Sequence, residues 1–493
     1  MRASPALVLL VLLVLVPTGA AAALIQGTTR PDRLRGTAKA DRIDAVFGGT
    51  DRVTCGKGVD VVTADPADRV ARDCEFVSRR ISVDTLTAAP GAQHGTEVEP
   101  SVAGWGSTAV ATFQVGRFID GGASGIGWAT SKDAGRTWRS GILPGLTAAS
   151  TPPGQALRAS DPAVAYDAAH GTWLISTLVL GTDFTALGIS RAGDGLDWGV
   201  PVVAARIATA TLGYDKEWIG CDNTSTSRYF GSCYLVYTDI ATPRLAVQVS
   251  HDGGATWGAP VDATDSFGIG AEGALPLIQP DGALTVVFDA QDTGMYAVRS
   301  IDGGTTFSPA TGISPIRSAR QPLLRAPPPP TATVDASGRM YVAWTDCSLR
   351  RNCDGDSVVL TTSTDGSTWT ALKRVPGTGF DSFVPGIAAH PSIPGRISVV
   401  TYFRTSGGCA NASCKIGVAV VTSRDGGATW TKPQRLDAVS PRYGWLANAG
   451  QQFVGDYVGA AYAGGRFVPV FALASPPLSK GRLREYMMAA SLS

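Results

Sequence analysis

The sequence contains little charge. Lysine, arginine, aspartate and glutamate make up 17% of its 493 residues, and the formal net charge is +1. A chain this close to neutrality gives no electrostatic basis for binding nucleic acid or an anionic membrane surface. We therefore expect neither a nucleic-acid partner nor membrane insertion.

Metal-binding patterns are also missing. The chain has 4 histidines, which are scattered, and no C-x-x-C spacing, so neither a histidine cluster nor a cysteine zinc site is predicted. The 8 cysteines instead fall into couples that are close in sequence. In an exported chain such couples predict disulfides, here Cys55–Cys74, Cys221–Cys233, Cys347–Cys353 and Cys409–Cys414.

Long amphipathic helices and membrane-spanning runs are absent from the sequence. Glycine (59) and proline (31) are abundant, which favours short strands joined by tight turns. The apolar run from Ala6 to Val16 is short for a membrane span, follows a positively charged start and precedes small residues. We interpret residues 1–23 as a signal peptide and expect a secreted, extracellular, unanchored protein.

Residues 25–77 repeat an aspartate that is followed two residues later by an aliphatic residue. The aspartates, spaced by 8 to 10 residues, are Asp32, Asp41, Asp51, Asp60 and Asp68. This spacing, with glycine-led turns, predicts a small parallel β-roll whose aliphatic residues point inward and whose aspartates stack at the turns. Residues 78–98 are expected to be a linker, in which 81–87 can supply a strand that closes the next domain.

The roll resembles the calcium-binding nonapeptide repeats of hemolysin-type secreted proteins, although only CGKGVD (55–60) approaches their turn motif. The resemblance implies calcium as a cofactor, with Asp41, Asp51 and Asp60 as ligands. The alternative is a metal-free roll, stapled by a disulfide, in which neighbouring arginines neutralise the aspartates. These arginines are Arg33, Arg42, Arg52 and Arg69.

Residues 99–493 repeat a different motif. The octet SKDAGRTW (131–138) recurs as SHDGGATW (250–257), SIDGGTTF (300–307) and SRDGGATW (423–430), with variants at 190–198 and 363–369. Each octet follows strand-like runs separated by turns, which predicts units of four strands. Such units are typical of a β-propeller, for which we expect seven blades, with six as the alternative.

The octet itself is predicted to be structural. Its aspartate can accept hydrogen bonds from the turn, its glycine tolerates a positive φ, and its final aromatic residue can pack into the neighbouring seam. No nucleophile stands beside a base within it. The structural aspartates are Asp133, Asp252, Asp302, Asp365 and Asp425.

The octet resembles the Asp-box, or bacterial neuraminidase repeat, and residues 99–493 resemble the sialidase superfamily. The resemblance implies an all-β propeller that acts on or binds extracellular glycans or glycoconjugates, with an exo-sialidase-like glycoside hydrolase as the specific activity. Sialidases use three arginines, a tyrosine nucleophile activated by a glutamate, and an acidic group. The family's phenylalanine-arginine-isoleucine-proline motif is absent; GRFID, around Arg117, lacks the proline.

Mainly acidic residues open the inner strands, and they indicate where a site would lie. From them and from nearby loops we predict Tyr443, Glu217 and Asp161 as catalytic residues. The predicted substrate-binding residues are Arg158, Arg320, Arg442 and Trp445. Two alternatives remain: a non-catalytic propeller that binds carbohydrate or protein, and a lyase or metal-assisted enzyme that holds calcium in the acidic ring. We expect a monomer.

Overall fold

The computed structural model describes residues 22–86, 89–209, 211–264, 271–291, 293–319, 321–478 and 482–493. The predicted signal peptide lies almost entirely outside these residues. The described chain is all-β, apart from the single-turn 3-10 segments η1 (Arg351–Cys353) and η2 (Tyr443–Trp445). It contains no helix of the length and apolarity needed to cross a membrane. All four predicted disulfides form.

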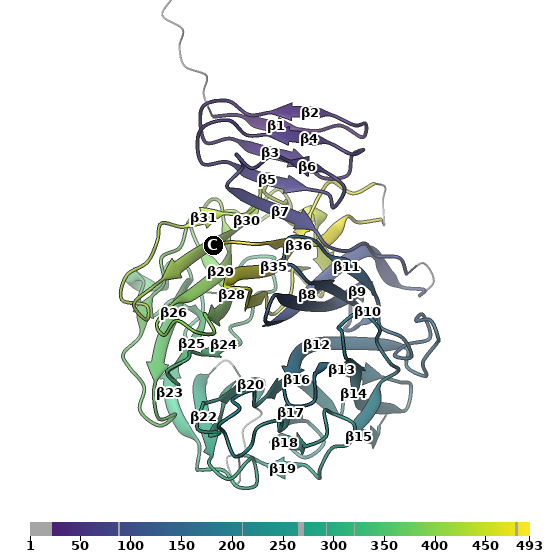
Figure 1. Cartoon of the computed structure of the whole chain (residues 1–493), viewed down its shortest axis with the longest axis vertical. Helices are drawn as coiled ribbons and strands as arrows, with labels where there is room; N and C mark the ends of the chain where they lie inside the picture. Colours follow the sequence, from purple (N-terminus) through teal and green to yellow (C-terminus); the bar gives the residue numbers. More distant parts are fainter. Residues whose placement is uncertain are drawn as a thin grey trace, which may run out of the picture.

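The N-terminal part is a parallel β-roll of two facing sheets (Figure 1). One sheet contains β1 (Leu24–Gln26), β3 (Arg42–Ala45), β5 (Val61–Ala64) and β7 (Phe76–Arg80), and the other contains β2 (Arg33–Arg35), β4 (Arg52–Thr54) and β6 (Arg69–Val70). Alternate residues of these strands point inward. The buried core between the sheets includes Leu34, Ile43, Val53, Val62 and the disulfide-bonded Cys55.

The aspartates form two hydrogen-bonded ladders, one on each edge of the roll, because each rung contains two strands. On one edge the N–H of Asp32 donates to Asp51 Oδ1 (2.8 Å), and the N–H of Asp51 donates to Asp68 Oδ1 (2.8 Å). On the opposite edge the N–H of Asp41 donates to Asp60 Oδ1 (2.7 Å). The carboxylates thus satisfy the N–H groups of the turns.

The predicted neutralisation of these aspartates by arginine is wrong. Among the described residues, the ion pair of the roll joins Arg80 to Asp65, and none is formed by the four arginines that follow the aspartates. The strand register places Arg33, Arg52 and Arg69 next to one another on the outer face. Successive side chains of a strand point to opposite faces, so an arginine on a strand does not meet the aspartate of the preceding turn.

The remainder of the chain forms a ring of antiparallel sheets (Figure 1). A four-stranded group, β8–β11, is linked by one residue pair, Ala123–Ala159, to a second group, β12–β15. The bounds of these strands are β8 Ala92–Trp105, β9 Thr108–Phe118, β10 Ala123–Ser131, β11 Arg139–Ile142, β12 Arg158–Asp167, β13 Thr172–Leu180, β14 Phe184–Ala192 and β15 Val202–Ala208.

Four further sheets have four strands each, in sequence order. Their bounds are β16 Tyr214–Cys221, β17 Cys233–Asp239, β18 Arg244–Ser250 and β19 Val261–Asp262; β20 Glu272–Ile278, β21 Leu284–Asp289, β22 Gly294–Ser300 and β23 Thr311–Pro315; β24 Thr331–Val334, β25 Met340–Asp346, β26 Ser357–Ser363 and β27 Lys373–Arg374; β28 Ser382–Ala389, β29 Ile397–Arg404, β30 Ile416–Ser423 and β31 Gln434–Arg435. A short hairpin, β32 Ala447–Asn448 and β33 Gln452–Phe453, follows. The core is divided among the seams between sheets, as where Leu174 and Ile189 pack with Leu235.

The roll completes the last sheet of the ring. This sheet contains β34 (Gly459–Ala463), β35 (Arg466–Ala474) and β36 (Glu485–Ala490), and β36 pairs antiparallel with β7. The closing strand is therefore Phe76–Arg80, not the expected 81–87, and β8 already begins within the predicted linker. The other edge of β7 pairs with β5, so one strand belongs to both the roll and the ring.

The octets form tight turns after the third strand of each group. In SHDGGATW, Asp252 accepts the N–H (2.9 Å) and the hydroxyl (2.6 Å) of Thr256, and the N–H of Gly254 donates to Ser250 Oγ (2.9 Å). Gly254 has a φ of 76°, and a Cβ there would lie 2.6 Å from Leu174 of the preceding sheet. Equivalent bonds hold the carboxylates of Asp133, Asp302, Asp365 and Asp425.

Two buried carboxyl groups lie where the ring closes. Glu97 of β8 accepts the N–H of Met487 (2.9 Å) and the hydroxyl of Ser82, and Glu485 of β36 accepts the N–H of Ala447 (2.6 Å). Burial raises the pKa of Glu97 to about 7 and the pKa of Glu485 well above its usual value. The closed ring therefore favours the protonated forms.

We predict that the free energy of unfolding falls as the pH rises from about 4.5 to above 7, with a contribution from Glu97 of up to about 3 kcal/mol. The reason is that Glu97 ionises near its ordinary pKa in the unfolded chain but only at higher pH in the folded protein. The change Glu97→Gln, which cannot ionise, should flatten this dependence in urea unfolding at low and high pH. The exposed substitution Asp183→Asn is the control, and an unaltered pH dependence in Glu97→Gln would contradict the assignment.

Candidate functional site

Five strands at the centre of the ring carry the same irregularity. In β8, β12, β16, β20 and β28, two residues interrupt the pairing with the next strand. The first of the two has a positive φ in each strand, namely Glu99 (55°), Asp161 (46°), Lys216 (53°), Gly273 (59°) and Val384 (47°). Such backbone costs about 1–3 kcal/mol at a non-glycine residue, and bulges of this kind redirect side chains. Here they bring Glu99, Asp161 and Lys216 to the central site.

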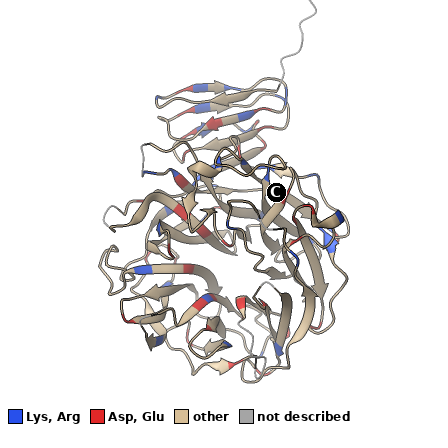
Figure 2. Cartoon of the chain, turned by 180° about the vertical axis from the view of Figure 1, so that it is seen from behind, with Lys and Arg blue, Asp and Glu red and all other residues tan. Residues whose placement is uncertain are grey.

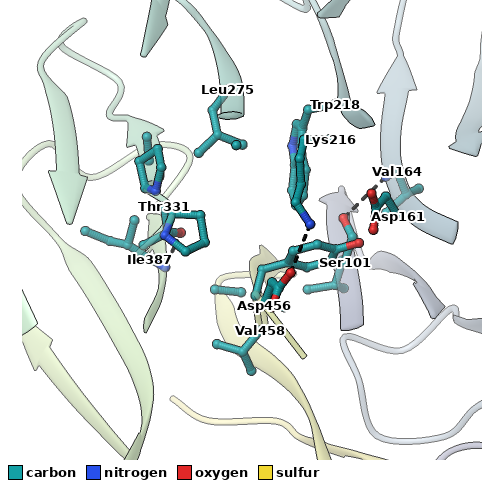
Figure 3. A pocket seen from close by; sticks show the side chains of 18 of the residues that line it. Ser101, Asp161, Val164, Lys216, Trp218, Leu275, Thr331, Ile387, Asp456 and Val458 are labelled. Atoms are coloured by element: carbon teal, nitrogen blue, oxygen red, sulfur yellow. Dashed lines mark hydrogen bonds and ion pairs between the residues drawn. The ribbon is translucent and has the colours of Figure 1, made fainter. Parts of the chain in front are cut away.

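An inner cavity of about 160 Å³ lies at the centre of the ring. It is lined by the innermost strand of every group, including Ser101, Trp218, Leu275, Thr331, Ile387 and Val458. Figure 3 shows the Lys216 side chain extending across this space to Asp456, with Asp161 and Ser101 on one side and Thr331 and Ile387 on the other. The cavity thus has a charged side and an apolar side.

An outer cavity of about 570 Å³ adjoins the inner one. Asp161 and Lys216 line both cavities, so the two meet at these side chains. The outer cavity is also lined by Phe184, Leu157 and Leu212, and by the charged residues Glu99, Arg117, Asp120, Arg158, Asp215 and Arg325. Its size and mixed lining are suited to a small polar ligand.

Asp456 is the ionised carboxylate of the site. Its Oδ2 accepts Lys216 Nζ (2.9 Å) and Arg325 Nη2 (2.5 Å), and its Oδ1 accepts Arg325 Nε (2.9 Å). Burial alone would raise the pKa of Asp456, but Lys216 and Arg325 together hold this pKa well below its usual value. The network joins β16, the segment before β24 and the segment before β34.

Two carboxyl groups near Asp456, those of Glu99 and Asp215, favour the protonated form instead. Burial, with the charges of Asp161 and Asp456, raises the pKa of Glu99 to about 7. Burial likewise raises the pKa of Asp215 to about 7. The charge of Lys216 lowers this pKa, whereas the charge of Asp161 and its hydrogen bond to Asp215 raise it. Near neutral pH the site therefore holds protonated and ionised carboxyl groups side by side.

Glu217 and Tyr457 leave polar atoms without partners. Among the described residues, neither carboxyl oxygen of Glu217 nor the hydroxyl of Tyr457 has a hydrogen-bond partner, and these atoms are buried. Burial and Asp161 raise the pKa of Glu217 well above its usual value. The Tyr457 ring packs edge-on against Trp218 (5.2 Å, 84°). Because buried polar atoms are rarely left unpaired, the two groups indicate a place for a polar ligand or water.

The structure separates the predicted catalytic residues. Asp161 and Glu217 line the inner cavity, whereas Tyr443 lines neither cavity. Tyr443 is fully buried in the hydrophobic core, and its N–H donates to the carbonyl of Cys414 (2.8 Å). The tyrosine that faces the site is Tyr457.

The predicted substrate-binding residues are dispersed as well. Arg158 lines the outer cavity and donates to Asp120 (2.7 Å). Arg442 is exposed, and its Cζ lies 5.6 Å from the centre of the Trp445 ring. Neither Arg442 nor Trp445 lines either cavity. Arg320 lies outside the described residues.

Lys216 and Tyr457 are site residues that the sequence did not predict, although a signal for Lys216 exists. The segments VEPS (98–101), SDPA (160–163), DKEW (215–218) and FVPG (383–386) occupy equivalent places in their strands. When these short segments are aligned with one another, Lys216 occupies the position equivalent to Glu99 and Asp161. Tyr457 precedes an inner strand whose pairing has no such interruption, so the same alignment would not have found it.

The roll aspartates do not fit a shared calcium site. Asp51 Oδ2 and Asp60 Oδ2 are buried without partners, but they belong to ladders on opposite edges of the roll. The carboxylate of Asp41 accepts the N–H groups of Ala23 (2.6 Å) and Thr37 (2.5 Å). In the part of the chain that the structure describes, no three histidine, cysteine, aspartate or glutamate side chains are grouped to hold a metal ion.

No protein-family model and no curated protein sequence matches the chain. Solved structures that resemble it include the α-L-arabinofuranosidase Arb93A of Fusarium graminearum (16% identity, TM-score 0.46, 70% of this chain and 98% of that one). Others are the NanB sialidase of Streptococcus pneumoniae (14%, 0.43, 84% and 70%) and a PL25 ulvan lyase (11%, 0.48, 80% and 94%). These neighbours are carbohydrate-active enzymes, but at such identities and TM-scores neither residues nor activity can be transferred.

We predict that Asp456→Asn destabilises the protein by about 3 kcal/mol or more, because Lys216 and Arg325 would both lose their buried partner. Arg325→Gln should cost much less, since Arg325 is partly exposed and Asp456 would keep Lys216. Urea unfolding at neutral pH measures both changes. If the two substitutions lowered the free energy of unfolding equally, the prediction that Lys216 and Arg325 both depend on Asp456 would be contradicted.

Proposed function

We propose that the protein is a secreted, seven-bladed β-propeller that acts on extracellular glycans at the two joined cavities. Six blades are the strand groups β8–β11, β12–β15, β16–β19, β20–β23, β24–β27 and β28–β31, and the seventh is β34–β36 completed by β7. An Asp-box-like octet after the third strand of the first six supports this division. Export through a signal peptide at 1–23 is consistent with four disulfides.

Hydrolysis of a glycosidic bond is the reaction that this arrangement supports best. The supporting observation is that two carboxyl groups in contact, Asp161 and Asp215, both line the outer cavity, and that the pKa of Asp215 is raised to about 7. Glycosidases need one carboxyl group to protonate the leaving oxygen and another to assist attack at the sugar carbon. We assign the first role to Asp215, whose pKa is raised to about 7, and the second to Asp161, which lies beside it.

The arginines of the outer cavity indicate whether the bound sugar is anionic or neutral. Arg117, Arg158 and Arg325 all line it, as a sialidase would require. Each, however, already contacts a carboxylate of the protein, respectively Glu99, Asp120 and Asp456. Because Arg158 and Arg325 are already paired with Asp120 and Asp456, we propose a neutral sugar at this site and keep the exo-sialidase as the narrower alternative.

The test is a panel of fluorogenic glycosides that includes neutral pentosides, neutral hexosides and a sialoside. Asp161→Asn and Asp215→Asn should each lower kcat on the preferred glycoside by about 100-fold or more. Asp183→Asn is the exposed control. No turnover of any glycoside, together with saccharide binding that Asp161→Asn weakens, would instead support a non-catalytic propeller.

The pH dependence of the reaction provides a second measurement. If Asp215 must be protonated, kcat/KM on the preferred glycoside should fall as the pH rises through about 7, because its pKa lies there. Asp215→Glu should move this limb of the profile while retaining some activity. A profile that stays flat between about pH 6 and 9 would remove Asp215 from the role of general acid.

A further inference from the structure

We propose that a tract of arginines on the roll and at its junction with the ring binds an anionic polysaccharide, one whose sugars carry sulfate or carboxylate groups. The arginine tract consists of Arg33, Arg52, Arg69, Arg72, Arg136 and Arg466. It shares no residue with the central cavities, so this site stands apart from the proposed hydrolysis.

The first part of the tract is a ladder on the outer face of the roll. Arg33, Arg52 and Arg69 lie opposite one another on β2, β4 and β6, which are neighbouring strands about 4.8 Å apart. All three are exposed, because the aliphatic residues that follow them turn inward. Figure 2 shows blue bands, together with some red, on the strands of the roll. Like charges placed opposite each other are destabilising, and a bound anionic chain would relieve this repulsion.

The second part is a groove of about 650 Å³ between the roll and the ring. Five arginines line it against two acidic residues; the arginines are Arg72, Arg79, Arg80, Arg136 and Arg466, and the acidic residues are Asp68 and Glu75. Of the five, Arg80 pairs with Asp65, and Arg79 donates to the carbonyl oxygens of Asp65 and Asp68 (3.2 Å each). Among the described residues, the remaining three form no ion pair.

Arg466 and Arg136 form the ring side of this groove. Ser491 holds the half-buried Arg466 through its hydroxyl (2.7 Å to Nε) and its carbonyl (2.5 Å to Nη2), neither of which neutralises the charge. Burial, and then the charge of Arg136, lower the pKa of Arg466. Ser491 thus holds Arg466 close to a second positive charge, an arrangement that a bound anionic group would stabilise.

The octet beside the roll departs from the other octets at the groove. Arg136 stands where the corresponding octets have Ala255, Thr305 and Ala428. In the same turn, Trp138 is half-buried, lines the groove and donates its indole N–H to the carbonyl of Gly135 (3.1 Å). An aromatic face next to fixed cations is suited to a sugar ring that carries an anionic group.

The small number of aromatic side chains favours a saccharide over single-stranded nucleic acid. Single-stranded nucleic acids are held by successive aromatic side chains on which bases stack. The ladder strands β2, β4 and β6 have the sequences RLR, RVT and RV, which contain no aromatic residue, and the groove adds one, Trp138. Four disulfides also indicate an oxidising, extracellular setting, where anionic polysaccharides occur.

The experiment measures binding of the full chain to dextran sulfate, polygalacturonate, uncharged dextran and single-stranded DNA by titration calorimetry. The test variant combines Arg52→Ser, Arg72→Ser and Arg136→Ser, which are exposed changes. The control variant combines Lys373→Ser, Arg374→Ser and Arg424→Ser; it removes the same charge from exposed positions elsewhere on the ring. Both variants should melt at the temperature of the parent protein.

We expect the test variant to bind its anionic polysaccharide at least about tenfold more weakly than the parent, and the control variant to bind like the parent. Binding of dextran sulfate alone would assign the ligand group as sulfate, and binding of polygalacturonate alone as carboxylate. Equal affinities of the two variants, equal binding of uncharged dextran, or tighter binding of DNA than of either polysaccharide would each overturn the proposal. Turnover at the central cavities should be the same in both variants.

Discussion

The pairing of β7 with β36 is the contact on which the rest of the architecture depends. A ring of sheets leaves an exposed strand edge unless the last sheet is closed, and exposed edges invite aggregation. Here a strand from the N-terminal roll closes it, and the other edge of that strand remains in the roll. The same contact fixes the roll against the ring, places Glu97 beside β36 and forms the arginine-lined groove.

Closure of the ring also explains how the central carboxyl groups acquire different protonation states. Once the inner strands converge, their bulges bring acidic side chains such as Glu99 and Asp161 together at buried positions. Asp456 stays ionised because Lys216 and Arg325 both contact it. The cations near Glu99 and Asp215 do not offset burial and the neighbouring carboxyl groups, so the pKa of each is raised. Glu99 and Asp456 are both almost fully buried, so the difference between their pKa values arises from their charged partners.

Sequence patterns predicted the local features and missed those that depend on distant strands. The disulfide couples, the roll and the octet turns each depend on residues within one or two rungs or hairpins, so spacing alone could indicate them. The site depends on the register of seven inner strands. Tyr443 and Tyr457 are 14 residues apart in sequence, but Tyr457 lines the central cavity whereas Tyr443 is buried in the hydrophobic core. The arginines of the roll do not pair with the aspartates that precede them, because adjacency in sequence does not imply contact between side chains on a strand.

The net charge of +1 conceals two regions of opposite character. The central cavities hold six carboxyl groups, if Glu217 and Asp456 are counted with Glu99, Asp120, Asp161 and Asp215, and these offset the nearby cations. Among the described residues, the six arginines of the tract on the roll and its junction form no ion pair, whereas Arg80 beside them pairs with Asp65. Because electrostatic interactions are screened within about 10 Å at ordinary ionic strength, a ligand at the junction experiences the local arginines rather than the total charge. Near-neutrality of the whole chain therefore does not exclude an anionic ligand at one part of its surface.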